Sequence, residues 1–147
     1  MTQAGYSGRP LAAKIGLKPG MDCWRHAMPD DIAGLLDAQQ PGLRLVATPS
    51  PGLTCAHVFV SDRPELASLL ATLRELLAAD GMIWVSWPKK SSKVPTTVTE
   101  DVVRDICLPM GLVDVKVCAV DAVWSGLKLV IRKELREAQA SRFEPDR

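Results

Sequence analysis

The chain has 147 residues, of which 47% are hydrophobic and 24% charged, and its formal net charge is +1. That length suits one domain with a substantial core, and the small net charge excludes a global field for capturing nucleic acid or a membrane surface. No apolar run approaches the ~20 residues needed to cross a bilayer, and no basic-then-apolar signal opens the chain. We therefore expect one cytoplasmic domain over residues 1–147, without a membrane or nucleic-acid partner.

The four cysteines, at positions 23, 55, 107 and 118, lie in apolar stretches and form no C-x-x-C pair. This usage is typical of small buried thiols in a reducing compartment. The spacings Cys23-x-x-His26 and Cys55-x-His57 raise the question of a metal site. An odd separation along a regular strand sends Cys23 and His26 to opposite faces. The sequence therefore predicts no metal and no cofactor.

Residues 1–20 predict an N-terminal arm with a short helix. Ser7 or Gly8 can cap this helix, and Pro10 falls in its first turn, where a missing N–H is tolerated. Gly16 is placed to end it.

Three strands and a helix are predicted next. The strands are expected at 21–27, 43–47 and 56–60, with a helix that Asp30 or Asp31 can cap between the first two. Only about seven residues join the second strand to the third, whereas a parallel crossover usually takes a dozen or more. The second strand is therefore expected either to run antiparallel or to cross over without a helix.

The clearest predicted helix begins at Asp62, which has capping-box spacing to Glu65, with Pro64 in the first turn. Leucines at helical spacing form one apolar stripe along it: Leu66, Leu69, Leu70, Leu73, Leu76 and Leu77. The pair Asp80-Gly81 is expected to stop the helix. The unbroken apolar run 82–87 then predicts a strand that is buried on both faces.

The last third of the chain predicts a helix and an antiparallel hairpin. Thr99 can cap the helix, and Pro109 is expected to end it. The stretches 113–117 and 127–132 alternate apolar and polar residues, which indicates half-exposed strands in antiparallel or edge positions. A C-terminal helix and tail are expected over 133–147.

This order of elements predicts an α/β fold. We expect a Rossmann-like three-layer sandwich with a mostly parallel sheet of about six strands that ends in an antiparallel hairpin. The ending resembles the C-terminal half of the Rossmann-like methyltransferase fold, in which the final strand inserts between its two predecessors. The chain is thus expected to have a truncated methyltransferase-like fold.

In open α/β sheets, ligands bind beyond the carboxyl ends of the parallel strands. Residues 27–31, 61–62 and 86–90 are expected at that edge, together with the turn of the final hairpin. Paired lysines near a helix start suit an anion, and a tryptophan at a strand end can stack a ring. A solvated loop, a core-edge residue and plain turn chemistry remain the alternatives. The candidate ligand-binding residues are Ser86, Trp87, Lys89, Lys90, Asp121, Trp124 and Ser125, with Tyr6 and Ser7 as a lid.

Four motifs stand out along the chain: GYSGxPL at 5–11, WVSWPKK at 84–90, TEDVVR at 99–104 and VCAVDxxWSGL at 117–127. Together they resemble one bacterial domain-of-unknown-function family of small proteins. The resemblance covers nearly the whole chain, and residues 23–55 match least well. It implies a Rossmann-like fold and carries no assigned reaction.

A methyltransferase that binds S-adenosylmethionine needs a glycine-rich turn after the first strand and an acid after the second. Here the first turn, 26–31, has no glycine pair, and the second strand ends Ala47-Thr48-Pro49. The sequence therefore disfavours such an enzyme, and no G-x-S-x-G elbow or other catalytic constellation stands out. It favours a protein that binds a small anionic or nucleotide-like ligand at the carboxyl edge. The alternatives are an interaction module with a degenerate pocket, bound to a protein partner or to itself, and then an uncharacterised enzyme.

Overall fold

The computed structural model describes residues 9–144. In this part of the chain one sheet contains six strands: β1 (Asp22–His26), β2 (Arg44–Leu45), β3 (Leu53–Phe59), β4 (Leu77–Pro88), β5 (Leu112–Ala119) and β6 (Trp124–Ile131). The α-helices are α1 (Leu11–Ile15), α2 (Asp30–Gln39), α3 (Arg63–Leu76), α4 (Glu100–Cys107) and α5 (Arg136–Arg142). Short 3-10 turns are η1 (Lys90–Ser92), η2 (Leu108–Met110) and η3 (Lys133–Leu135). None of the helices in this part is long and apolar enough to span a membrane.

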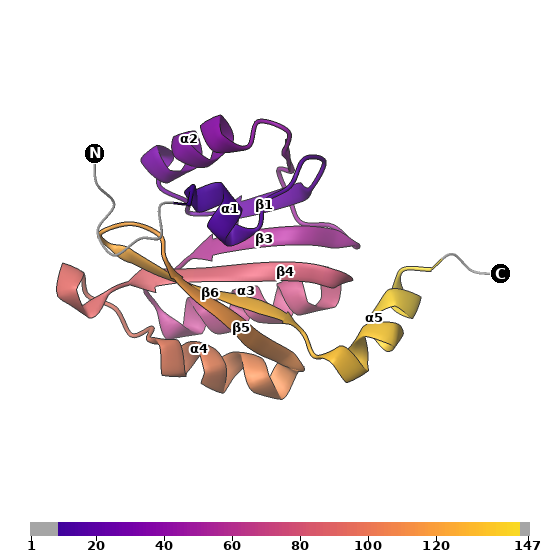
Figure 1. Ribbon diagram of the computed structural model, residues 1–147. Coiled ribbons are helices and arrows are strands. Elements are labelled where there is room, and N and C mark those ends of the chain that lie inside the picture. The colour runs from indigo at the N-terminus through magenta and orange to yellow at the C-terminus, as the bar shows by residue number, and fades with distance from the viewer. Residues whose placement is uncertain (1–8, 145–147) are drawn as a thin grey trace.

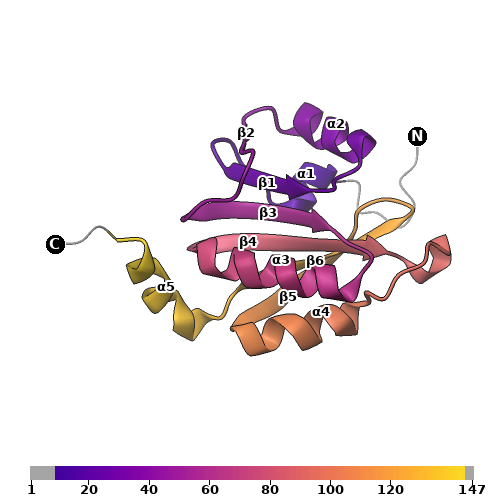
Figure 2. The same ribbon diagram turned by 180° about the vertical axis from the view of Figure 1, so that it is seen from behind.

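The strand order is β2-β1-β3-β4-β6-β5, and the strands β1 to β4 run parallel. The last strand, β6, lies antiparallel between β4 and β5. Helix α1 lies in front of the sheet in Figure 1, and α3 lies in front of it in Figure 2, which shows the opposite side. The predicted three-layer α/β fold with a closing antiparallel hairpin is confirmed.

Strand β2 runs parallel to β1 and reaches β3 without an intervening helix, so the second of the two predicted alternatives is correct. β2 has two residues, paired as Asp22↔Arg44 and Cys23↔Leu45. Because β2 is so short, the chain has only a short distance to travel from its end to the start of β3. The residues that join the two strands can cover this distance without a helix, since each extended residue spans about 3.3–3.6 Å. The carboxyl half of β1 consequently has no strand beside it on the β2 side.

Two predicted helix starts are confirmed. The Asp62 carboxylate accepts a hydrogen bond from Glu65 N at 3.2 Å, and Thr99 Oγ1 accepts one from Val102 N at 3.2 Å. Gly16 ends α1 with φ 89°, a left-handed conformation that favours glycine.

Two other predicted helix starts differ from the structure. The N-cap of α2 is Pro29, and Asp30 and Asp31 lie in the first turn instead, where acidic side chains suit the positive end of the helix dipole. The N-cap of α1 is Pro10, whereas the predicted caps Ser7 and Gly8 lie outside the described residues.

The predicted helix stop at Asp80-Gly81 is wrong, because α3 ends at Leu76 and β4 begins at Leu77. The register between β3 and β4 jumps from Leu53↔Leu77 to Cys55↔Met82, so β4 carries extra residues there. Gly81 lies in this irregular part. A Cβ on Gly81 would lie 2.7 Å from the Leu77 side chain and 3.0 Å from Leu53 O, which explains the glycine by close packing.

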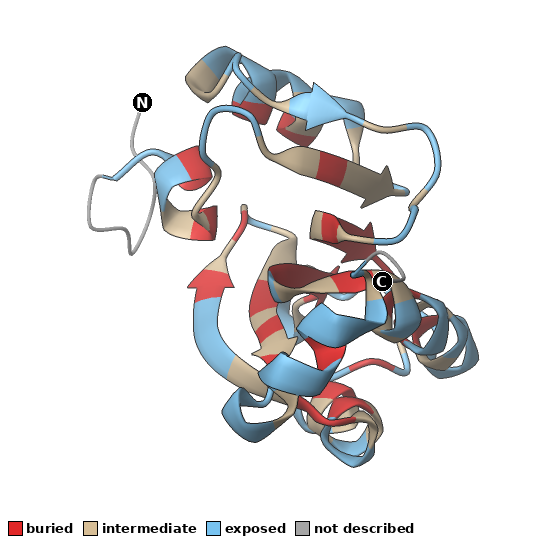
Figure 3. Cartoon of the chain, turned by 90° about the vertical axis from the view of Figure 1, so that its right-hand side faces the viewer, coloured by how far each residue is buried: buried red, intermediate tan, exposed pale blue. Residues whose placement is uncertain are grey.

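Buried side chains form one cluster on each face of the sheet. The first lies beneath α3 and α4 and includes Leu66, Leu70 and Leu73 of the predicted leucine stripe. The second lies beneath α1 and α2 and surrounds Trp84, which is fully buried. Figure 3 shows the buried residues on the strands and on the inner sides of the helices. Both faces of β4 are therefore covered, as its apolar run predicts.

Removing the Thr99 cap should destabilise the protein modestly. Thr99→Ala leaves Val102 N without its side-chain acceptor, and we expect the free energy of unfolding to fall by about 1 kcal/mol. Thr99→Ser is the matched control, because it keeps the hydroxyl acceptor and should stay close to the wild type. Urea denaturation followed by circular dichroism measures both variants. An equal loss in the two would show that the methyl group, and not the cap, carries the effect.

Candidate functional site

A hollow of about 480 Å³ opens where β4 ends, at the carboxyl edge of the sheet. We call it the β4-end hollow. In Figure 1 this edge is on the left, where the chain leaves β4 toward η1 and where the turn between β5 and β6 lies. Its lining residues come from β4, η1, α4, the segment before α4 and β6: Trp87, Pro88, Lys89, Lys90, Thr96, Val98, Thr99, Glu100, Asp101 and Ser125.

Strand pairing brings Trp87 and Ser125 together in this hollow. They are register partners on the antiparallel strands β4 and β6, so their side chains leave the same face of the sheet. Trp87 belongs to the cluster beneath α3 and α4 and is only 7% exposed, so it contributes an apolar part of the wall. Lys89 N donates to Val123 O at 2.7 Å, which fixes the chain just beyond β4.

The segment 93–98, which we call the strap, forms one wall of the β4-end hollow. Thr96 Oγ1 and Thr97 N both donate to Ser61 O, each at 2.9 Å. Arg63 N donates in turn to Thr97 Oγ1 at 2.8 Å. These bonds hold the strap against the end of β3 and the start of α3, so the wall has a defined position.

Charges of both signs line the β4-end hollow. The carboxylates of Glu100 and Asp101 both contact the Arg104 guanidinium within α4. Among the described residues, no ion pair to Lys89 or Lys90 is found. The ammonium groups of Lys89 and Lys90 are therefore not neutralised by an ion pair to any described residue and can contact a ligand.

Three predicted site residues lie elsewhere. Ser86 is fully buried, and its Oγ lies 2.8 Å from His57 Nε2. Trp124 packs edge-on against Phe59 at a centroid distance of 5.0 Å, in the cluster beneath α1 and α2. The Asp121 carboxylate accepts hydrogen bonds from the N–H groups of residues 123 and 124, each at 2.8 Å, which is turn chemistry.

The separation follows from strand geometry, because neighbouring residues of a strand point to opposite faces. Trp87 and Trp124 thus share the predicted rim of the sheet, but their side chains leave opposite faces and do not line one hollow. The predicted lid residues Tyr6 and Ser7 lie outside the described residues.

Sequence reasoning missed the side chains that meet between β1 and β3. The chain turns from β1 outward to β2 and then returns to β3, so this is the topological switch point at which such sheets bind ligands. His26, at the end of β1, lies with its Nε2 3.1 Å from Glu65 Oε2 in the first turn of α3. The next residue, Ala27, has φ 54°, a left-handed conformation that is unusual without glycine. The contact between His26 and Glu65 follows from the strand order, which places β1 beside β3.

The buried histidine is not part of that crevice. His57 lies beneath α1 and α2, stacked on Phe59 with ring centroids 4.5 Å apart. Burial, with a smaller effect of the Arg25 charge, lowers the pKa of His57 to about 3. The ring is therefore neutral at physiological pH, and with Ser86 fully buried beside it we assign the pair to the core.

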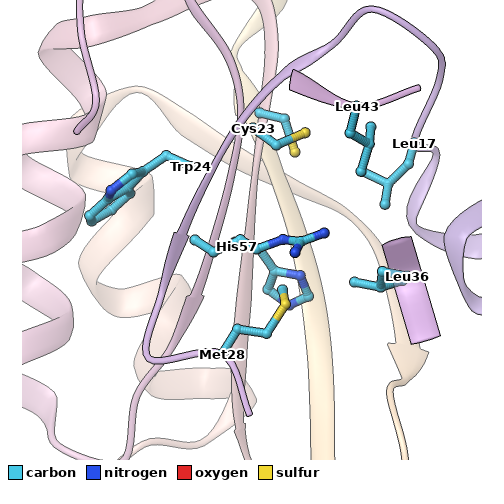
Figure 4. Close-up of a pocket in the computed structure, with 9 residues that line it drawn as sticks. Leu17, Cys23, Trp24, Met28, Leu36, Leu43 and His57 are labelled. Atoms are coloured by element: carbon cyan, nitrogen blue, oxygen red, sulfur yellow. The ribbon is translucent and has the colours of Figure 1, made fainter. Parts of the chain in front are cut away.

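All four cysteines are buried and free, which confirms the prediction of small buried thiols. Two of them line a small cavity of about 10 Å³ beneath α1 and α2, shown in Figure 4. No group of three or more histidine, cysteine or acidic side chains in residues 9–144 is arranged to hold a metal ion.

Solved structures with a similar fold are S-adenosylmethionine (SAM)-dependent methyltransferases and related proteins. A SAM-dependent methyltransferase from Aquifex aeolicus matches with a TM-score of 0.58 and 13% identity, over 82% of this chain and 88% of that one. Magnesium protoporphyrin IX methyltransferase from Synechocystis PCC 6803, with bound SAM, gives 0.54 and 11%, over 82% and 74%. LepI in complex with SAM gives 0.52 and 12%, over 83% of this chain but only 39% of LepI. No protein-family model matches the chain, and a search of curated proteins finds no match.

This finding corrects the functional prediction made from the sequence. That prediction favours a generic anionic or nucleotide-like ligand, or an interaction module, and disfavours a SAM methyltransferase. The structures that share the fold include SAM-dependent methyltransferases, one of them with SAM bound. The functional prediction is wrong because it relies on the absence of two local motifs. The similarity to these structures lies instead in the order and direction of the strands. The structural similarity establishes that the chain has a Rossmann-like, methyltransferase-like fold.

Proposed function

We propose that this chain has a methyltransferase-like function and binds SAM at the carboxyl edge of its sheet. One observation carries the proposal: the fold, including the reversed β6 between β4 and β5, is similar to that of SAM-dependent methyltransferases. The switch point between β1 and β3 is the place where such a sheet binds a ligand. SAM supplies an electrophilic methyl group on a positively charged sulfur.

The first turn of α2 fits the amino-acid end of SAM. Pro29 is the N-cap and forms no side-chain cap, so N–H groups at the helix start are left for a carboxylate. The exposed side chains of Asp30 and Asp31 suit the ammonium and sulfonium charges. Ala27 already has the left-handed conformation that a glycine supplies in such turns.

The nucleoside end of SAM would meet different residues from those of a site with a glycine-rich turn and an acid after the second strand. No acid follows β2 to accept hydrogen bonds from ribose hydroxyls, since the next residues are Val46, Ala47 and Thr48. The carboxylate of Glu65, half-exposed beside His26, is an acidic group that lies at the switch point. We assign the amino-acid end to the start of α2 and the ribose hydroxyls to Glu65.

The β4-end hollow lies further along the same edge and suits the second substrate. Trp87 offers an apolar edge there, and Lys89, Lys90 and Ser125 offer polar contacts. A substrate held in this hollow would lie beyond β4, with the neighbouring β3 between it and the switch point. The proposed role of these side chains is to orient the acceptor group, with no proton transfer assigned to them.

Calorimetric titration tests the donor site. We expect SAM and its demethylated product S-adenosylhomocysteine to bind with Kd values in the micromolar range. The double variant Asp30→Asn, Asp31→Asn should weaken SAM binding by about tenfold, which is about 1.4 kcal/mol. It should weaken S-adenosylhomocysteine binding less, because that ligand has a neutral sulfur.

Asp80→Asn is the matched control, since it removes one exposed carboxylate at the opposite edge, beside the starts of β1 and β3. It should leave both affinities unchanged. If the double variant bound both ligands equally more weakly, Asp30 and Asp31 would not be interacting with the sulfonium group of SAM. An absence of heat for both ligands at millimolar concentration would contradict the proposed function.

A further inference from the structure

Cys23 on β1 and Cys55 on β3 are adjacent across the parallel ladder. They are direct register partners, and both side chains belong to the cluster beneath α1 and α2. Neighbouring strands lie about 4.8 Å apart, and disulfides join residues whose Cα atoms are about 4.4–6.8 Å apart. The backbone therefore places these two thiols within bonding reach. The pairing could not be predicted from the sequence, because the two cysteines lie far apart along the chain.

The two thiols are chemically unequal. A hydrogen bond from Cys55 lowers the pKa of the Cys23 thiol, and the positive charge of Arg25 acts in the same direction. The same hydrogen bond, together with burial, raises the pKa of Cys55. A thiolate is the reactive form of cysteine, so Cys23 is the member of the pair that should react first with an oxidant.

The other two cysteines lack this arrangement. Burial raises the pKa of Cys107, to about 11, and also raises that of Cys118. The register partner of Cys118 is Gly126, which has no thiol, and Cys107 lies on α4. They are internal references for the reactivity of an ordinary buried thiol in the same molecule.

The pair lines the small cavity shown in Figure 4, where the Cys23 side chain lies near those of Leu17, Leu43 and His57. Its volume of about 10 Å³ is close to the space that one water molecule needs. Hydrogen peroxide is close to this size, whereas a bulky disulfide such as oxidised glutathione is far too large for the cavity.

We propose that Cys23 and Cys55 are a peroxide-sensitive pair that forms a reversible disulfide between β1 and β3. The Cys23 thiolate attacks one peroxide oxygen, breaks the O–O bond and becomes a sulfenic acid, with release of water after protonation. The Cys55 sulfur then attacks the sulfenic sulfur, the S–S bond forms, and the oxygen leaves as a second water. The two thiols are oxidised by two electrons in total, and one peroxide is reduced to two waters.

The disulfide should cross-link the two strands that flank the switch point. The spacing of neighbouring strands already lies within the Cα range that disulfides join, so the bond can form with the strands in place. Oxidation should therefore prevent β1 and β3 from separating.

Mass spectrometry of the full chain tests this inference. The protein is treated with hydrogen peroxide, quenched, unfolded and alkylated with N-ethylmaleimide. We expect the mass before alkylation to fall by about 2 Da. Alkylation should then reach only half of the four cysteines, and a peptide should link Cys23 to Cys55. Dithiothreitol should reverse the change, and Cys107→Ser should leave it intact.

The Cys55→Ser variant separates the two steps. It cannot form the disulfide, so dimedone should trap the sulfenic acid at Cys23, about tenfold faster than at Cys107 or Cys118. Three results would overturn the inference: labelling spread evenly over the remaining cysteines, a link that joins any other pair, or no oxidation at a peroxide concentration that oxidises free cysteine.

Discussion

Trp84→Ala should lower the free energy of unfolding by about 3–5 kcal/mol, the largest effect of a single substitution that we expect in this chain. Trp84 is fully buried at the centre of the cluster beneath α1 and α2. Its indole Nε1 donates to Ile15 O at 2.9 Å, which anchors the end of α1 to β4. Alanine would leave a cavity and also an unsatisfied carbonyl oxygen at the end of that helix.

Trp84→Phe separates these two contributions. Phenylalanine fills most of the space but donates no hydrogen bond, so we expect a loss of about 1–3 kcal/mol. Urea denaturation followed by far-ultraviolet circular dichroism measures both variants without relying on tryptophan fluorescence. If Trp84→Ala lost less than 1 kcal/mol, the described contacts of α1 with the sheet would be wrong.

The protein should lose stability as the pH falls below the ordinary histidine pKa of 6.5, because His57 accepts a proton far less readily in the folded chain than in the unfolded one. Its pKa is about 3 in the folded chain, so between these values the unfolded state binds one more proton. Stability that is present above pH 6.5 is therefore lost as the pH falls. From the linkage relation we expect a loss of about 2 kcal/mol between pH 8 and pH 5.

His57→Gln is the matched variant, because glutamine stays neutral over this range and its amide can take part in a hydrogen bond, as the imidazole does with Ser86 Oγ. Carboxylates that titrate in acid contribute equally to both proteins, so the difference between them isolates the histidine. We expect the difference in unfolding free energy between the two proteins to change by about 2 kcal/mol from pH 8 to pH 5. Parallel pH profiles would show that His57 is accessible to protons in the folded state.

The sequence was most informative where the physical cause is local. The caps at Asp62 and Thr99 depend on a side chain and an N–H three residues away, and both are present in the structure. The stripe of leucines on α3 needs only helical periodicity. The antiparallel ending could also be predicted, because the alternation in β5 and β6 marks strands with one half-exposed face.

Predictions that needed strand register were less successful. The start of β4 at Leu77 depends on an irregular pairing with β3 that no local pattern encodes. Trp87 and Trp124 lie on one rim, as predicted, but alternation along the paired strands β4 and β6 sends their side chains to opposite faces. The Cys23–Cys55 pairing and the meeting of His26 with Glu65 likewise exist only once β1 lies beside β3.

The most direct test of the proposed SAM site is an amide chemical-shift titration of the isotope-labelled protein with S-adenosylhomocysteine. We predict that the largest shifts fall on residues 26–32 and 60–65, which surround the switch point. Residues 74 and 142, at the far end of α3 and in α5, should remain unchanged and report on nonspecific effects. Saturable shifts confined to the first two ranges would support the account. No shifts at millimolar ligand, or shifts centred on residues 74 and 142, would contradict it.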